Sequence, residues 1–586
     1  MTKLLLVNSK EEFFEGKSLA GKDAIVLTTD YEAMKEAQKA GCTTKIPRDY
    51  LTFKECEAID EKAQFIDRQW YRLSKQRIVY KGVELPLLEE NTLLVRLVSI
   101  LKRVFATKKA IEKEKPETIF YCKDNEVFKE VVKGFGKRIK TKVFKAKKVE
   151  RNSFNKIDFE WIKKNWKRAA KKVITLQAPK EDHNRIVIAM KERGFAGALK
   201  EALDKDPKVE LLNLDDFILE KTFSPHYWGK GFGASKKELR EFSQAWKEMS
   251  SMQVFLDAMK FRNIDLLPLL KPIFDSLFKE RFGKMTVLID AFDFWIKREK
   301  PRIIVLWADN LPVERMMALV AKQNNVPTMV VMHGIVSRGP GFVPIYADYL
   351  ASYGKGDKKI FKKLGEDPKK VVPLGAPRFD ELLHNKKNLH TTHEFYAKNL
   401  FDSRKKIVAF AAQPVMKKRA VDFLDDKDRI NELIIEAFNE LKDVQLVIKP
   451  HPAEYLGSYN NVIEALGSRA KVLRDINVYD MLNACELLIT GSSTVGLEAM
   501  ILGTPMIEVK PSKADDNYPY WESGAALKAE TGKQLATAIK KLLFDKKALA
   551  KNTVKRKAFL KEYASGIDGK ATKKTVEFVK ELAKKA

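Results

Sequence analysis

The sequence predicts an α/β protein with two sheet-based lobes and an additional α/β unit at its N-terminus. Short apolar runs rich in β-branched residues alternate with amphipathic stretches, which is the pattern of parallel sheets covered by helices. The chain has 586 residues, more than one domain usually contains, and 45% of them are hydrophobic, enough for packed cores. We therefore expect an accessory unit over 1–150, a first Rossmann-like lobe over 151–390, a second over 391–545 and a helical tail over 546–586.

The accessory unit is predicted from its apolar runs. Its expected strands are residues 4–7, 24–29 and 117–122. A helix is expected over 29–41, followed by a long helical region over 60–114.

The two lobes show the same alternation. The expected strands of the first lobe are residues 185–190, 209–214, 302–308, 327–334, 346–354 and 370–375. A long helical stretch over 236–300 separates the second of these strands from the third. A polar segment over 384–395 is the predicted linker between the lobes. The expected strands of the second lobe are residues 405–413, 444–452, 484–494 and 504–510.

The chain is strongly basic, with a formal net charge of +30. Such an excess favours anionic partners: nucleic acid, an anionic membrane surface or phosphorylated substrates. The stretch from Lys133 to Lys172 sets aromatic residues among lysines, which fits a basic helix on a membrane surface or a core helix with a solvated lysine face. No nucleic-acid module motif is present, so nucleic acid is not expected as a partner.

Cysteine usage and the N-terminus predict a cytoplasmic protein. The four cysteines have no metal-like spacing and are interpreted as reduced thiols: Cys42, Cys56, Cys122 and Cys485. The N-terminus lacks the long apolar region of a signal peptide, and no run approaches the length of a membrane span.

Polar residues that directly follow the apolar runs are the candidate site residues, because parallel sheets bind ligands beyond the carboxyl ends of their strands. His333 and Gly334 follow one strand of the first lobe. The histidine could act as a general base, donate a hydrogen bond to a phosphate, or only bond to the backbone. Arg378 follows another strand and could pair with phosphate, or form a surface ion pair with Asp380.

The second lobe offers two further strand ends. Lys449 and His451 stand in a proline-flanked turn that fixes the backbone on both sides of the histidine. A small-residue turn then leads into a helix and suits a phosphate, although such residues also serve as ordinary helix caps; its members are Ser492, Ser493, Thr494 and, one helical turn further on, Glu498. No acidic pair of the DxD kind that binds a metal stands out, and Asp515-Asp516 is the nearest to one. We therefore expect no metal and no cofactor. Cationic groups and helix dipoles would neutralise a leaving phosphate instead.

The order of these motifs resembles GT-B-type enzymes of capsule and surface-carbohydrate synthesis. The phrases VMHG, ADYLASYG, PLGAPRFDEL, KPHPAE and TGSSTVGLEAMILGTPMI, between Arg302 and Val509, carry the resemblance. The group includes polysialyltransferase-like and Kdo-transferase-like enzymes, with CDP-glycerol glycerophosphotransferases as a further branch.

The resemblance implies roles for particular residues. His333 and His451 would serve the active site, one of them as the base. His451, Ser492 and Ser493 would hold the nucleotide of a CMP-linked donor, and Glu498 its ribose. The HG motif lacks the flanking Trp and Thr-Pro of the glycerophosphotransferase branch, and PLGAPRFD is closer to surface-carbohydrate enzymes and to non-hydrolysing UDP-N-acetylglucosamine 2-epimerases.

The sequence therefore predicts a metal-independent glycosyltransferase. Its donor would be a nucleotide-activated sugar (CMP-, CDP- or UDP-linked, with CMP favoured over UDP), and its acceptor a growing or lipid-linked surface glycan. Peripheral attachment to the inner membrane face would suit the basic surface. The alternatives are a CDP-glycerol-type glycerophosphotransferase, a UDP-N-acetylglucosamine 2-epimerase-like enzyme and a non-catalytic polyanion-binding protein.

Overall fold

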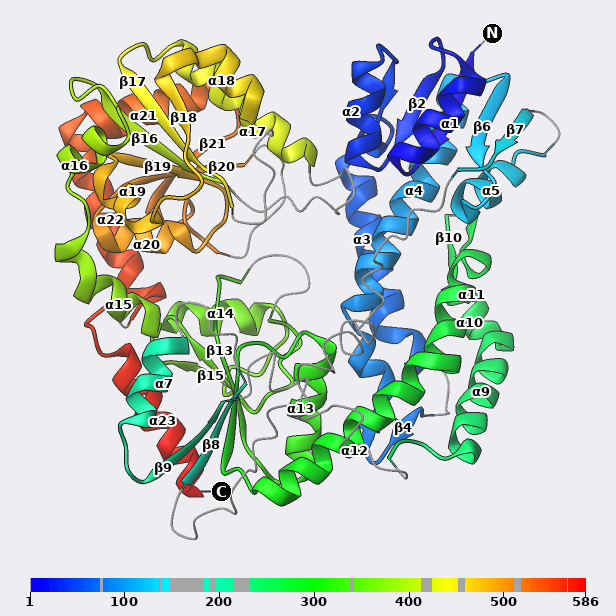
Figure 1. Cartoon of the computed structure of the whole chain (residues 1–586), viewed down its shortest axis with the longest axis horizontal. Coiled ribbons are helices and arrows are strands. Elements are labelled where there is room, and N and C mark those ends of the chain that lie inside the picture. The colour runs from blue at the N-terminus through cyan, green and yellow to red at the C-terminus, as the bar shows by residue number, and fades with distance from the viewer. Residues whose placement is uncertain are drawn as a thin grey trace, which may run out of the picture.

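The protein is described here by a computed structural model of the whole chain (Figure 1). The structure describes residues 2–73, 77–136, 139–146, 184–189, 196–213, 232–262, 264–336, 342–412, 424–451, 459–510, 518–565 and 567–585.

The N-terminal unit, residues 2–146 as far as they are described, is built on a five-stranded parallel sheet of order β3-β2-β1-β6-β7. The strands are β1 (Lys3–Val7), β2 (Ile25–Thr28), β3 (Thr44–Lys45), β6 (Thr118–Cys122) and β7 (Lys140–Phe144). Their helices begin at polar caps: Ser9 accepts from the Glu12 N–H before α1 (Lys10–Ala20), and Asp30 accepts from the Ala33 N–H before α2 (Tyr31–Lys39). The basic stretch of the sequence lies mostly outside the described residues, so its predicted membrane helix stays a prediction.

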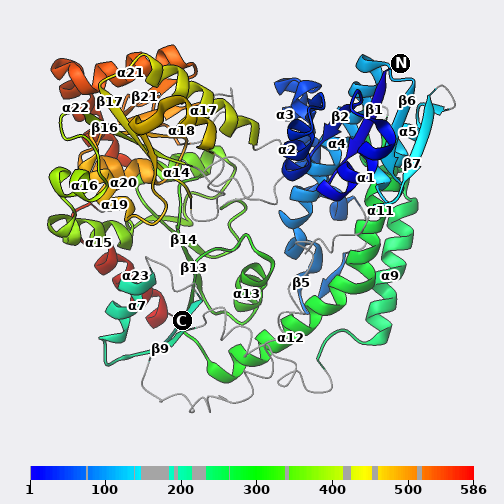
Figure 2. The ribbon, with the colours of Figure 1, turned by 45° about the horizontal axis from the view of Figure 1, so that its top comes forward.

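A column of helices stands below this sheet (Figures 1 and 2). Its N-terminal members are α3 (Phe53–Gln69), α4 (Thr92–Glu114) and α5 (Glu126–Lys133); its later members are α9 (Lys236–Ser251), α10 (Gln253–Ala258), α11 (Leu267–Ser276) and α12 (Phe282–Glu299). Trp70 packs on Phe274 at a ring distance of 5.0 Å, and Lys62 donates to the Ala258 carbonyl at 2.6 Å. Helices of the predicted first lobe thus pack with the predicted accessory unit, and the boundary at residue 150 stays a prediction.

The first lobe contains a six-stranded parallel sheet of order β15-β14-β13-β12-β8-β9. Its strands are β8 (Asn184–Ala189), β9 (Val209–Asn213), β12 (Ile303–Leu306), β13 (Thr328–Val331), β14 (Tyr349–Ser352) and β15 (Val371–Pro373). Its helices are α7 (Ala196–Asp204), α13 (Pro312–Gln323), α14 (Lys355–Lys363) and α15 (Pro377–Asn385). The strands match the expected ones to within a few residues at their ends.

The second lobe repeats this plan with the order β18-β17-β16-β19-β20-β21. Its strands are β16 (Lys406–Ala411), β17 (Val444–Lys449), β18 (Ala470–Val472), β19 (Leu487–Thr490), β20 (Met506–Val509) and β21 (Ala526–Ala529). Its helices are α16 (Thr392–Lys398), α17 (Leu424–Asn439), α18 (Asn460–Leu466), α19 (Val478–Ala484), α20 (Val495–Leu502), α21 (Gly532–Phe544) and α22 (Lys546–Tyr563). The predicted α/β class is confirmed: two Rossmann-like lobes in the GT-B arrangement with an N-terminal α/β addition.

Three local features refine these expectations. The predicted linker 384–395 lies between α15 of the first lobe and the second lobe, and it includes helix: α15 runs to Asn385, and α16 begins at Thr392 and packs on α19. Cys485 is buried as expected, but it caps α19 and precedes the strand in which it was expected. The tail is not one unit: α22 stays with the second lobe, whereas α23 (Ala571–Lys585) returns to pack on α7 and α15 of the first (Figure 1).

Candidate active site

The strand ends of the first lobe meet α20 of the second. The Ile335 N–H donates to the Thr494 hydroxyl at 3.1 Å, and a methyl group added at Gly334 would lie 3.6 Å from the same oxygen. The predicted residues Gly334 and Thr494 are therefore neighbours, although they lie in different lobes. Thr494 uses its hydroxyl across the junction, and it makes no side-chain cap bond to its own helix.

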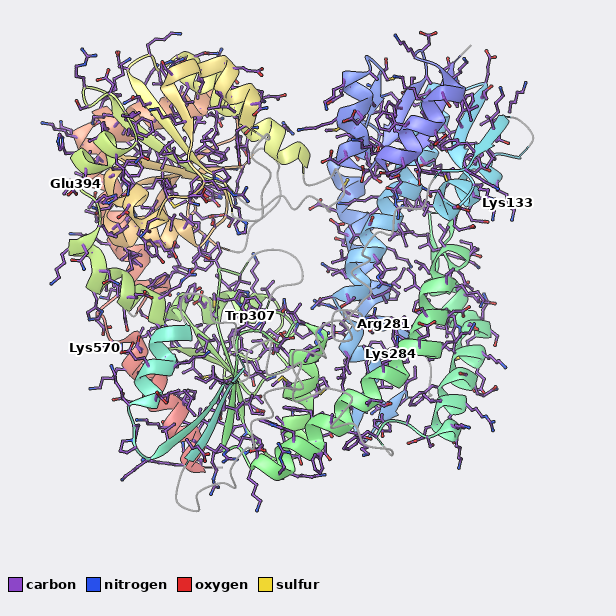
Figure 3. The ribbon with its side chains drawn as sticks, viewed as in Figure 1. Lys133, Arg281, Lys284, Trp307, Glu394 and Lys570 are labelled. Atoms are coloured by element: carbon purple, nitrogen blue, oxygen red, sulfur yellow. The ribbon has the colours of Figure 1, made fainter. Side chains whose placement is uncertain are left out.

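His333 is held between two aromatic rings at the end of β13. Its ring lies 4.3 Å from that of Trp307 and 4.7 Å from that of Phe342. Its Nδ1 is 2.9 Å from the Trp307 carbonyl oxygen, which can only accept, so Nδ1 carries the hydrogen and Nε2 the free lone pair. Burial lowers the pKa of His333 to about 4, with a smaller contribution from Arg378. The imidazole is thus neutral at physiological pH, with Nε2 unprotonated (Trp307 is labelled in Figure 3).

Arg378 carries positive charge into the junction between the lobes. Gly375 turns the chain at a φ of 89° after β15, and Pro377 opens α15, which sets Arg378 in its first turn. Its Nη1 donates to the His333 carbonyl at 3.4 Å, and its Nη2 lies 3.3 Å from Glu498 Oε1. Within the described part of the chain, the buried Nε has no hydrogen-bond partner.

Glu498 is the acidic side of this pair. It is 5% exposed, and the Tyr479 hydroxyl also donates to its Oε1, at 3.4 Å. Burial raises the pKa of the Glu498 carboxyl, while Arg378 and Tyr479 oppose this rise. The sequence predicted a ribose acceptor here; the structure shows a carboxyl already engaged, through one oxygen, with both lobes.

The small-residue turn joins β19 to α20 as expected. The Tyr520 hydroxyl donates to the Ser493 carbonyl at 2.8 Å, which fixes the turn from the neighbouring segment. Ser492 lies half-buried in the same turn. Backbone N–H groups at the start of a helix of this kind favour an anion.

Lys449 and His451 lie along the same edge: Lys449 is the last residue of β17, and His451 follows two residues later. β17 is separated from β19 by β16 alone, and the three strands run parallel. Lys449 Nζ donates to the Arg474 carbonyl at 2.6 Å, and burial lowers the pKa of its ammonium group. His451 is half-buried, while Pro452, Ala453 and Glu454 lie outside the described residues, as does Asp515-Asp516.

The structure adds residues that the sequence did not single out. Trp307 and Phe342 sandwich His333, and Tyr479 bonds to Glu498. Trp307 could have been found, because it ends an apolar run next to the candidate strand. Phe342 and Tyr479 follow no such run, and only the packing shows their roles.

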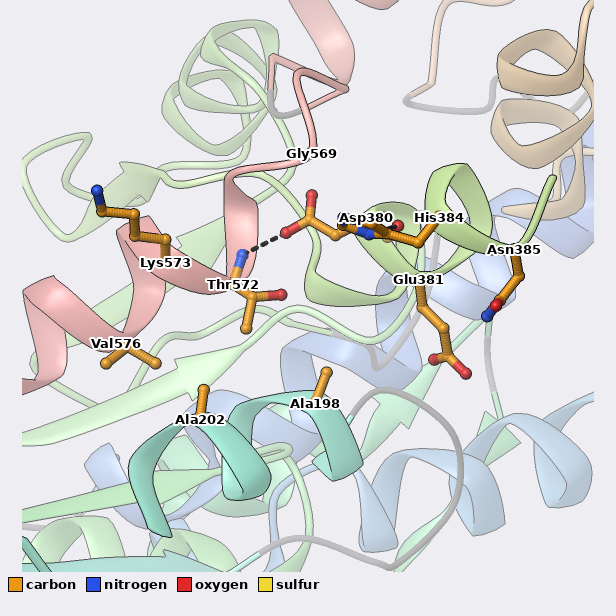
Figure 4. A pocket seen from close by; sticks show the side chains of 10 residues that line it. All are labelled: Ala198, Ala202, Asp380, Glu381, His384, Asn385, Gly569, Thr572, Lys573 and Val576. Atoms are coloured by element: carbon orange, nitrogen blue, oxygen red, sulfur yellow. Dashed lines mark hydrogen bonds between the residues drawn. The ribbon is translucent and has the colours of Figure 1, made fainter. Parts of the chain in front are cut away.

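A cavity of about 530 Å³ lies away from this site, between α7, α15 and α23 (Figure 4). Alanine and valine side chains form part of its lining. Asp380 accepts there from the N–H groups of Ala571 and Thr572 at 3.1 and 2.7 Å, and so caps α23. The predicted surface pair of Arg378 with Asp380 is wrong, because Arg378 pairs with Glu498 and Asp380 holds the returning helix.

The residues that the structure describes contain neither a metal site nor a membrane span. No group of three His, Cys, Asp or Glu side chains there is arranged to hold a metal ion. None of the described helices is long and apolar enough to cross a membrane.

Comparisons with known proteins place the chain in a family. The model of the family described as UDP-N-acetylglucosamine 2-epimerase matches residues 252–579, more than half of the chain. No curated protein matches the sequence.

Several solved structures are similar in fold at low sequence identity. MnaA from S. aureus with UDP is 17% identical, with 68% of this chain and 96% of that chain covered and a TM-score of 0.45. UDP-GlcNAc 2-epimerase from Neisseria meningitidis with UDP-GlcNAc is 14% identical, with 68% and 99% covered and a TM-score of 0.43. The wall teichoic acid polymerase TagF is 15% identical, with 73% and 98% covered and a TM-score of 0.39. On the strength of the family match, the chain is an enzyme of the UDP-N-acetylglucosamine 2-epimerase family.

Proposed function

We propose that this enzyme is a glycosyltransferase that moves a sugar from a nucleotide-activated donor to a growing or lipid-linked surface glycan. The observation that carries the proposal is the state of His333. A neutral imidazole with its free lone pair on Nε2 stands where the lobes meet, beside a buried arginine. Transfer of a sugar to a hydroxyl group needs one such base and a cation for the leaving phosphate.

The proposed reaction assigns each group a step. The acceptor oxygen forms a bond to the anomeric carbon of the donor while His333 Nε2 takes the hydroxyl proton. The bond between that carbon and the donor phosphate oxygen breaks, and the phosphate leaves with the electron pair. Arg378 offers its Nε hydrogen, which lacks a partner among the described residues, to that phosphate.

The second lobe would hold the nucleotide. Ser492 and Ser493 would donate from the turn before α20, and Lys449 and His451 would approach the phosphate from the neighbouring strand end. Glu498 bonds to Arg378 and Tyr479 through Oε1, so a ribose hydroxyl would be accepted by Oε2. A CMP-linked donor is favoured by the motif resemblance, and the net charge of +30 supports an acceptor at an anionic membrane face.

The second candidate is epimerisation of a UDP-linked sugar, which the family match favours. Inversion of a sugar carbon by proton removal and return needs acid–base groups on both faces of the ring. Glu498 is paired with Arg378, and Asp309, two residues beyond Trp307, accepts from two backbone N–H groups. Because both carboxylates already have partners, we favour glycosyl transfer over epimerisation. The two reactions differ in a measurable way: an epimerase needs no acceptor and exchanges the sugar hydrogen with deuterium oxide.

The first experiment is a thermal-shift panel of CMP, CDP, UDP and GDP, with inorganic phosphate as control. A ligand that binds the native state alone raises the melting temperature. A response to CMP or CDP that is lost in His451→Ala supports a cytidylate donor. A response to UDP alone moves the proposal towards UDP-linked sugars, and turnover of CDP-glycerol would identify a glycerophosphotransferase.

The base is tested with the donor so identified. His333→Ala should lower kcat by about 10²- to 10⁴-fold and leave donor affinity nearly unchanged. His384→Ala is the matched control, because that ring bonds to the Asp380 carbonyl of its own helix, away from the junction. Full turnover in His333→Ala with lost donor binding would refute the assignment.

A further inference from the structure

The N-terminal unit is connected to the candidate site by buried polar contacts. Arg315 of α13 is fully buried, and its guanidinium donates to the Leu87 and Glu90 carbonyls at 2.5 and 3.0 Å. It also donates to the Asp309 and Asn310 carbonyls at 3.2 and 3.1 Å. One side chain thus ties residues 87–90 of the N-terminal unit to the segment that follows β12.

The carboxylate of Glu90 makes a second connection. It is 2% exposed and accepts from two phenols: Tyr71 of the N-terminal unit at 2.8 Å, and Tyr346 of the first lobe. The ring of Tyr346 lies under the Arg315 guanidinium at 4.5 Å. The adjoining Glu89 pairs with Arg281 at 2.6 Å, where the helical column meets this segment (Figure 3).

From Tyr346 the contacts lead to the two segments that flank the His333 ring. The N–H groups of Tyr346 and Ala347 both donate to Asp309 Oδ2, at 2.7 and 2.9 Å. Asp309 is two residues beyond Trp307, which forms one wall of the His333 ring. Phe342, four residues before Tyr346, forms the other wall. The segments that carry the two walls are therefore fixed to each other, and Glu90 fixes one of them from outside the lobe.

We propose that Glu90, acting through Tyr346, is a positioning residue for His333, so that the N-terminal unit completes the active site. The inference rests on the proposed role of His333 as base. It assigns a function to residues that precede the family match, which begins at residue 252. A buried carboxylate that accepts from the Tyr346 hydroxyl restrains that phenol, because loss of this bond leaves buried polar groups unpaired.

The two phenols provide a matched pair of variants. Tyr346→Phe removes the bond that leads to the His333 segment and keeps the ring beneath Arg315. Tyr71→Phe removes the other bond to the same carboxylate and leaves that segment in place. Each variant removes one hydroxyl that donates to the buried Glu90 carboxylate. If Glu90 only stabilised the fold, the two variants should therefore have similar effects on the His333 pKa and on kcat.

The first readout is the pKa of His333, which is measured by NMR titration of the histidine rings in histidine-labelled protein. The chain has seven histidines, and His333→Gln identifies the resonance. In the wild type we expect titration near a pKa of about 4. In Tyr346→Phe the looser sandwich admits water, and the pKa should rise by about one unit or more towards its ordinary value. In Tyr71→Phe it should stay at the wild-type value.

The second readout is turnover. Tyr346→Phe should lower kcat by about tenfold or more with donor KM within about twofold, because the base is misplaced while donor contacts remain. Tyr71→Phe should retain kcat. Glu90→Gln keeps an acceptor oxygen for Tyr346, so its kcat should fall between those of the two phenylalanine variants. If Tyr346→Phe does not fold, Glu90→Gln takes its place in the test.

Equal results for Tyr346→Phe and Tyr71→Phe, in pKa and in kcat, would overturn the proposal. An unchanged His333 pKa in both Tyr346→Phe and Glu90→Gln would do the same. A raised pKa in Tyr346→Phe, in a protein whose wild type transfers no sugar from any nucleotide donor, would support the positioning role and count against the glycosyltransferase.

Discussion

At the scale of single residues, the pKa of His333 makes a prediction about stability. An unfolded chain protonates this imidazole near pH 6.5, whereas the native protein does so near pH 4. Between these values the unfolded state binds more protons, so stability falls as the pH drops from 6.5 towards 4. Between pH 7.5 and 4.5 the wild type should lose about 2.5 kcal/mol more than His333→Gln. Urea unfolding of both proteins at the two pH values measures this difference. If the wild type and His333→Gln lose the same stability, the His333 ring is solvated in the native protein.

Sequence patterns located the candidate residues but not their partners. His333, Gly334 and Arg378 were expected at strand ends because polar residues there directly follow apolar runs. The structure has His333 and Gly334 just after β13, whereas Arg378 lies in the first turn of α15. The ion pair of Arg378 with Glu498 joins two lobes, and its existence depends on the angle between them. No periodicity within one element encodes that angle. The catalytic and binding roles of these residues stay predictions.

At the scale of elements, α14 and α22 approach each other too closely for any residue but glycine. A methyl group at Gly354, the N-cap of α14, would meet the backbone of Glu562 and Tyr563 at the end of α22. Gly354→Ala should therefore lower the free energy of unfolding by about 1–3 kcal/mol, because one helix must shift. Gly197→Ala is the control: the site on α7 is open, and alanine there should be neutral or stabilise by up to about 1 kcal/mol. Equal effects in urea unfolding would contradict the packing described.

Elements with a local signal were predictable, and those held by distant contacts were not. The strands follow from apolar runs that are buried on both faces. α16 carries a capping box, Thr391 with Glu394, so a signal for this helix within the predicted linker was present in the sequence. The return of α23 to the first lobe has only a weak signal, the buried positions Val576, Val579 and Ala583 among lysines. Its docking depends on Asp380, nearly 200 positions earlier in the chain.

At the scale of the whole molecule, two lobes and an N-terminal addition could be predicted, but not how the addition is attached. One continuous buried cluster extends from Leu4 through the helical column into both lobes. One face of the second-lobe sheet has a separate cluster, which includes Leu446 and Ile448. Because such contacts join residues about 200 positions apart, as Trp70 and Phe274 do, sequence patterns could not reveal them.

This continuity predicts that the N-terminal sheet and the first lobe unfold together. Trp70 is 1% exposed and packs on Phe274 and Phe278, so Trp70→Ala should cost about 3–5 kcal/mol. Native-state hydrogen exchange would follow β1, β12 and β17 separately. We expect Trp70→Ala to lower the protection of β1 and β12 equally and that of β17 less. Phe438→Ala, within the separate cluster of the second lobe, should show the reverse order. Loss confined to β1 in Trp70→Ala would mean that the N-terminal unit unfolds independently, and the buried contacts of Glu90 and Arg315 would then not couple it to the first lobe.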